Sequence, residues 1–101
     1  MNRVQSFRQM VQDRGRQLRK LPFSELAALA TLPAEAVIVD GHKGTLSVIV
    51  ENCDDRKLKI VVQGFLCMWI PIIKHVALHG FYKHPDGSIT EMQEVEFYDY
   101  D

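Results

Sequence analysis

The sequence predicts an α+β fold in which two N-terminal helices pack on an antiparallel meander sheet of four or five strands. Three observations lead to this prediction. Apolar residues recur at helical spacing in roughly the first 30 residues, they alternate with polar residues from about residue 36 onward, and turn-forming clusters separate the alternating segments. The 101 residues contain no linker, internal repeat or low-complexity segment, so we expect a single domain over residues 1–101.

The first expected helix spans residues 4–21. Its apolar residues follow one another at helical steps and would form one stripe: Val4, Phe7, Met10, Val11, Leu18 and Leu21. Such a stripe is typical of a helix that packs one face on a core. Arg14 stands where an apolar residue is expected and Gly15 follows, so the helix is expected to bend or end there.

A second, short helix is expected between Pro22 and Pro33. Ser24 can serve as its N-cap, because a serine hydroxyl accepts a hydrogen bond from the first turn of a helix. Pro33 cannot continue a helix, so the element must end before it.

The alternating segments predict strands joined by short turns. Leu58, Ile60 and Val62 share one side of their strand, which we expect to face the core while the other side is partly wet. The expected strands are residues 36–40, 45–52, 57–63 and 88–98, and the expected turns are residues 41–44, 54–56 and 84–87.

Residues 72–79 fit two interpretations. As a helix, the segment would begin with Pro71 at its first position and end at Gly80. As a strand, it would continue the meander. The sequence favours the strand, because the turn at residues 84–87 then forms a hairpin between this segment and the final strand.

Composition excludes several classes of protein. With 47% hydrophobic and 25% charged residues, the chain is typical of globular proteins. Its longest stretch without a charge is residues 60–73, or 14 residues, whereas a membrane-spanning helix needs about 20. Cys53 and Cys67 lack a CxxC spacing and no secretory signal is visible, so we expect free thiols and a cytoplasmic location. The Arg-rich start also fits a transit peptide, although the proline-marked second helix favours a structural role.

The net charge of −1 conceals a gradient along the chain. Residues 1–20 carry a balance of +5, residues 21–85 balance at zero, and residues 86–101 carry −6. The basic residues of the first helix form a candidate nucleic-acid patch: Arg8, Arg14, Arg16, Arg19 and Lys20. No aromatic residues for base stacking are interleaved with these arginines, which disfavours nucleic acid as a partner. We expect instead that the basic and acidic ends complement each other, within one chain or across a dimer.

The histidines are the first candidates for metal or acid–base chemistry. On a helix, His75 and His79 would share a face and could chelate one ion, but the HExxH pattern of zinc sites is missing. On a strand they would lie about 13 Å apart. We therefore predict no metal site and no cofactor. A histidine acting as a general base would need an acid nearby, which Glu91 or Glu94 could supply.

The apolar run at residues 65–73 is the strongest candidate for a binding surface. Helices can cover only one face of the sheet in so small a domain, so apolar residues on the other face would need a second subunit. The candidate partner-binding or ligand-binding residues are Phe65, Met68, Trp69, Ile72, His75 and His79.

The sequence favours a small non-enzymatic binding protein that acts through protein–protein association, either as a homodimer or with another protein. It contains no catalytic signature, and no catalytic residue is assigned. One alternative is a small-molecule-binding or enzymatic cupped sheet with a pocket near Trp69. A third possibility is nucleic-acid binding through the basic N-terminal helix, and no membrane partner is expected.

Overall fold

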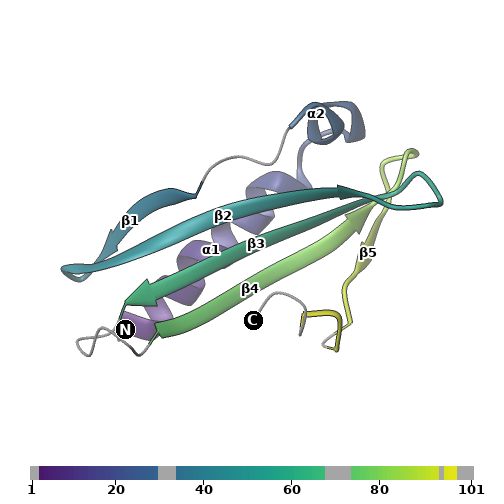
Figure 1. Ribbon diagram of the computed structural model, residues 1–101. Helices are drawn as coiled ribbons and strands as arrows, with labels where there is room; N and C mark the ends of the chain where they lie inside the picture. The colour runs from purple at the N-terminus through teal and green to yellow at the C-terminus, as the bar shows by residue number, and fades with distance from the viewer. Residues whose placement is uncertain (1–2, 30–33, 68–73, 94, 98–101) are drawn as a thin grey trace.

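A long helix packs along one face of a five-stranded antiparallel sheet (Figure 1). The computed structural model describes residues 3–29, 34–67, 74–93 and 95–97. Consecutive strands are neighbours in the sheet, so the predicted α+β class and meander topology are confirmed. Within the described residues the elements are α1 (Arg3–Arg19), α2 (Phe23–Ala28), β1 (Glu35–Val39), β2 (His42–Asn52), β3 (Leu58–Cys67), β4 (Lys74–Lys83) and β5 (Ile89–Glu91).

Helix α1 continues past Gly15 to Arg19, so it does not end at this position, which was one of the two outcomes expected there. The reason lies in the packing of the helix on the sheet. Gly15 is buried, and a Cβ added to it would lie 2.1 Å from Cδ2 of His79 on β4. Glycine costs about 1 kcal/mol relative to alanine inside a helix, and here it allows the close approach of α1 to β4.

The alternation of β2 and β3 divides the sheet into a core face, which meets α1, and an outer face. Leu58, Ile60 and Val62 are buried on the core face, as predicted. Gly64 continues the same row of β3, and a Cβ added to it would lie 2.6 Å from Cζ of Phe7. The core cluster consists of Phe7, Val11, Leu18, Leu26, Val39, Leu46, Val48, Leu58, Ile60, Val62, Leu66, Ala77 and Phe81.

Helix α2 begins two residues earlier than expected. Its N-cap is Pro22, which makes no side-chain capping hydrogen bond, so the prediction of Ser24 as N-cap is wrong. Leu26 is fully buried and anchors this short helix in the core. Within the part of the chain that the structure describes, neither helix is long and apolar enough to cross a membrane.

The turn between β1 and β2 is shorter than the predicted turn at residues 41–44. Val39 pairs with His42, which leaves a two-residue turn of Asp40 and Gly41 with φ values of 49° and 81°. Two successive positive φ angles are characteristic of a type I′ hairpin turn, and an Asp-Gly pair favours this conformation. His42 and the two residues after it therefore belong to β2.

The strand interpretation is confirmed for residues 74–79, which lie in β4, while residues 72–73 lie outside the described residues. The predicted turn at residues 84–87 joins β4 to β5, and its last residue, Gly87, has a φ of 92°.

The final strand is shorter than the predicted residues 88–98, because β5 ends at Glu91. The described residues that follow place Met92 and Phe97 against the outer face of the sheet at Gly80. A Cβ added to Gly80 would lie 2.4 Å from Sδ of Met92 and 3.0 Å from Cε1 of Phe97. Because the chain leaves the sheet after Glu91, the side chains of Met92 and Phe97 can pack over Gly80.

We predict that Gly64→Ala lowers the free energy of unfolding by about 1–3 kcal/mol, because the new methyl group would overpack the site occupied by Phe7. Chemical denaturation followed by circular dichroism measures this change. The double variant Gly64→Ala/Phe7→Leu lacks the atom nearest to the new methyl group, so the effect of Gly64→Ala should be smaller in a Phe7→Leu background. Equal effects in the two backgrounds would contradict the assigned contact.

Candidate binding surface

Among the described residues, the outer face of the sheet is covered at one end and open at the other. Near β5, Met92 and Phe97 cover Gly80, and Val61, which pairs with Gly80, is fully buried. Near β1, by contrast, the side chain of Ile38 is 72% exposed. We call the uncovered part the open face, and its residues are Ala36, Ile38, Lys43, Thr45, Phe65 and Cys67.

Strand register brings these residues together. Ala36 pairs with Thr45 and Ile38 pairs with Lys43 across β1 and β2. Thr45 in turn pairs with Phe65 across β2 and β3. Directly paired residues of an antiparallel ladder place their side chains on the same face, so three neighbouring strands contribute to one surface.

A hollow of about 460 Å³ lies on the open face. Its lining includes the apolar residues Ala36, Ile38 and Phe65. Lys43, Thr45 and Cys67 add an ammonium, a hydroxyl and a thiol. The surface can therefore bury an apolar group and offer it a small number of polar contacts.

The sheet separates the binding residues that the sequence predicted. Phe65 lies on the open face, whereas His79 pairs with Val62 and lies on the core face beneath α1. The two therefore do not line a common pocket. The backbone of His75 pairs with Leu66. Met68, Trp69 and Ile72 lie outside the described residues.

Arg19 joins the end of α1 to β4 and β5. Its Nε donates a hydrogen bond of 3.0 Å to Nε2 of His79. Its two terminal nitrogens donate to the two carboxylate oxygens of Glu91 at 2.5 Å and 2.6 Å. This bidentate pair confirms, for these two residues, the expectation that the basic and acidic ends of the chain complement each other.

Two further contacts complete this group of side chains. The guanidinium of Arg19 lies 5.0 Å from the centre of the Phe81 ring. Lys83 is 6% exposed, and its Nζ donates a hydrogen bond of 3.1 Å to the backbone oxygen of Arg19. A cation at the last carbonyl groups of a helix interacts favourably with the helix dipole. We call Arg19, His79, Phe81, Lys83 and Glu91 the Arg19 cluster.

The electrostatics of the Arg19 cluster favour a neutral histidine. Burial lowers the pKa of His79, and the positive charge of Arg19 lowers it further. The hydrogen bond from Arg19 also lowers the pKa of Glu91. Glu91 is one of the two acids that the sequence analysis named as a partner for a histidine base. Here Arg19 lies between the two groups and donates hydrogen bonds to both His79 and Glu91. The Nε2 lone pair of His79, which would accept a proton, already accepts this hydrogen bond.

The basic residues of α1 have different surroundings. Arg14 pairs with Glu35 at 3.1 Å and Arg16 pairs with Asp13 at 3.2 Å, while Arg19 binds Glu91. Arg8 and Lys20 are exposed. Three of the five predicted patch residues therefore have a carboxylate partner within the chain.

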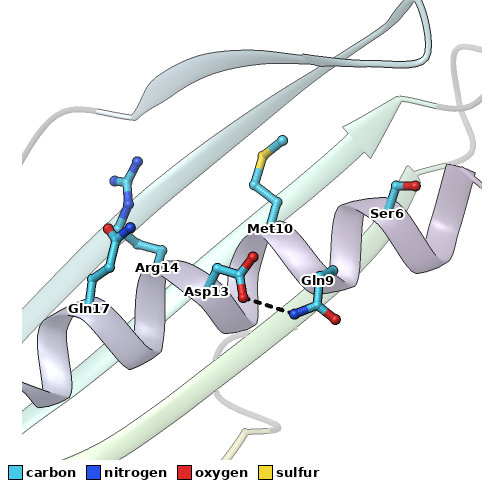
Figure 2. Close-up of a pocket in the computed structure, with 6 residues that line it drawn as sticks. All are labelled: Ser6, Gln9, Met10, Asp13, Arg14 and Gln17. Carbon is cyan, nitrogen blue, oxygen red and sulfur yellow. Dashed lines mark hydrogen bonds between the residues drawn. The ribbon is translucent and has the colours of Figure 1, made fainter.

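Figure 2 shows a second hollow, which lies on α1 beside this basic stretch. Met10 and Arg14 extend from the same side of the helix, and Asp13 accepts a hydrogen bond of 2.8 Å from Gln9. Its lining is mostly polar and includes both charge signs: Ser6, Gln9, Met10, Asp13, Arg14 and Gln17. A nucleic-acid phosphate placed here would meet Asp13 as well as Arg14.

The described residues contain no group of three or more His, Cys, Asp or Glu side chains that could hold a metal ion. Cys53 and Cys67, both half-buried, are free thiols.

Sequence reasoning missed most of the open face, including Ala36, Ile38, Lys43 and Thr45. One signal could have found it. The Asp40-Gly41 pair marks a two-residue hairpin turn, which fixes the register of β1 on β2 and places these four side chains on one face.

Comparisons with known proteins assign no family to the chain. No protein-family model matches it, and neither the curated proteins nor the solved structures give a match. The open face and the Arg19 cluster are therefore the features from which function can be inferred.

We predict that acidification below about pH 6.5, the ordinary pKa of histidine, destabilises the fold through His79. Its pKa is lower in the folded chain, so the unfolded chain binds the proton more readily and the free energy of unfolding falls as the pH falls. His79→Gln preserves an acceptor for Arg19 and does not titrate. Denaturation between pH 5 and pH 7 should show a shallower pH dependence for this variant. Equal slopes would contradict the role of His79, because Glu91 and the other titrating groups are common to both proteins.

Proposed function

We propose that this chain is a non-enzymatic binding protein that acts through protein–protein association, and that it forms a homodimer through the open face. The observation that carries the proposal is Ile38, a large apolar side chain that is 72% exposed at the rim of an apolar hollow. Single exposed apolar residues are common on protein surfaces, but one beside an apolar hollow provides a continuous surface that a partner can cover.

Burial of Ile38 in a dimer would contribute a substantial part of the free energy of association. Removing one isoleucine side chain from water contributes about 1.5–3 kcal/mol. A symmetric dimer would bury the residue twice, once in each copy. Phe65, half-buried on the same face of β3, adds an aromatic contact of the kind enriched at interfaces.

The chemistry of the open face also predicts how association responds to salt. The charged ends of the chain meet within one molecule at Arg19 and Glu91, so this pair is not available to join two copies. Apolar contacts persist in ~1 M salt, where the Debye length is about 3 Å. We therefore expect the dimer to be insensitive to salt.

We predict that Ile38→Lys weakens the dimer about 100-fold, because two apolar contacts of roughly 1.5 kcal/mol each are lost and 1.4 kcal/mol corresponds to a factor of ten. Sedimentation equilibrium against the 11.6 kDa monomer mass measures the dissociation constant. Val95→Lys is the matched control, because Val95 is 65% exposed but lies after β5, away from the open face. A wild-type chain that stays monomeric at high micromolar concentration would refute the proposal.

We predict that dimerisation protects Cys67 but not Cys53 from alkylation. Both thiols are free and half-buried, which makes them a matched pair. Cys67 lines the hollow, whereas Cys53 lies at the turn that joins the opposite ends of β2 and β3. Mass spectrometry after a short pulse of iodoacetamide should show labelling of Cys67 falling as protein concentration rises. The same dependence at Cys53 would place the interface elsewhere, and no dependence at Cys67 would show that the interface leaves the hollow open.

The hollow supports small-molecule binding as a second candidate function. Its volume of about 460 Å³ lies within the range of roughly 300–1,000 Å³ that is usual for ligand sites. Native mass spectrometry of the purified protein tests this alternative. A bound organic molecule that is absent from a Phe65→Ala variant would favour the ligand over the partner, whereas a dimer peak without added mass favours association.

A further inference from the structure

We infer that two copies of this chain join by backbone pairing of their β1 strands, which extends the sheet across a two-fold axis at Val37. This inference rests on the proposed self-association and specifies how it occurs. It concerns the β1 edge, at which no other described strand pairs, whereas the open face supplies the side chains next to that edge.

The two edges of the sheet differ in how far they are protected. Natural edge strands avoid pairing with other chains by being short or by carrying charged residues or proline. β5 has three residues and ends in Glu91, whose carboxylate binds Arg19. β1 has five residues, and its central three, Ala36 to Ile38, are all apolar. The β1 edge is therefore the one suited to pairing.

Hydrogen-bond alternation identifies the groups that β1 presents at this edge. In a two-residue hairpin the residues that flank the turn, here Val39 and His42, form a hydrogen-bonded pair. Hydrogen-bonded pairs recur at every second residue, so Val37 and Glu35 also direct their N–H and C=O groups to β2. Ala36 and Ile38 therefore direct theirs away from the sheet, toward a partner strand.

Strand length then selects the register. β1 runs from Glu35 to Val39, so an antiparallel pair of β1 strands matches all five residues only when Val37 lies opposite the partner's Val37. In this register Ala36 lies opposite the partner's Ile38, and each of these pairs exchanges both backbone hydrogen bonds. The arrangement is isologous, as a two-fold axis requires.

The side chains fit this register. On the outer face, the large and exposed Ile38 lies beside the partner's Ala36, which is small and also exposed. On the core face, two half-buried valines meet at the axis. Glu35 lies opposite the partner's Val39, and its carboxylate already binds Arg14 at 3.1 Å, so the register opposes no two like charges.

Amide hydrogen exchange measured by nuclear magnetic resonance tests the pairing on the unmodified chain. The amides of Val37 and Val39 are bonded within the chain and should exchange slowly at any concentration. The amides of Ala36 and Ile38 should slow at least tenfold when the protein passes from monomer to dimer. Fast exchange at both positions in a sample that light scattering shows to be dimeric would overturn the edge pairing and leave the proposed dimer in place. A chain that is monomeric throughout would overturn both.

Disulfide trapping tests the register independently. In the Cys53→Ser/Cys67→Ser background, Val37→Cys should form a cross-linked dimer on mild oxidation. Opposite residues at such a non-hydrogen-bonded position lie about 4.5 Å apart between Cα atoms, within the range for a disulfide. Glu35→Cys is the control, because its two copies would lie about 13 Å apart along the strands. Efficient cross-linking at Glu35→Cys, or none at Val37→Cys in a background that still dimerises, would overturn the register.

Discussion

The close contact between α1 and the middle of the sheet is the constraint on which the rest of the structure depends. Two glycines make it possible. Gly64 leaves room on β3 for the ring of Phe7, and Gly15 leaves room on α1 for the ring of His79. A side chain at either position would have to displace a ring that is packed between the two layers. The helix therefore has one position along the sheet, and that position brings Arg19 to the edge where His79, Lys83 and Glu91 bind it.

The position of α1 also decides which apolar residues remain uncovered. The helix covers the core face, and the short α2 adds Leu26 to the same layer. The outer face receives its cover from the residues after β5, which place Met92 and Phe97 on Gly80. At the other end of the sheet the described residues leave Ile38 exposed. Within the described residues the open face thus adjoins the β1 edge, and a partner strand paired with β1 would lie beside Ile38 in the plane of the sheet.

Sequence patterns predicted the elements well because strand and helix periodicity reflect local burial. The alternation of Leu58, Ile60 and Val62, the hairpin after β4 and the order of the strands were all predicted. The errors lie where tertiary contacts override local preference. Gly15 does not end α1, and its lack of a side chain serves helix–sheet packing. The final strand stops at Glu91, since the apolar residues beyond it pack on the outer face instead of continuing the ladder.

The candidate site likewise combines features that local sequence patterns predict with features that tertiary contacts decide. Sequence alone determined the α+β class, the meander order and the presence of opposite charges at the two ends of the chain, because these follow from composition and from periods of two and 3.6 residues. Only the tertiary structure decided that Phe65 and His79 lie on opposite faces of the sheet. It also decided that Arg19 forms its ion pair with Glu91 of the same chain and that Ile38 stays exposed. Each of these depends on strand register and on which layer covers which face. The layers and most of the strand register are set by contacts between residues far apart in the chain, whereas the Asp40-Gly41 turn encodes locally only the register of β1 on β2.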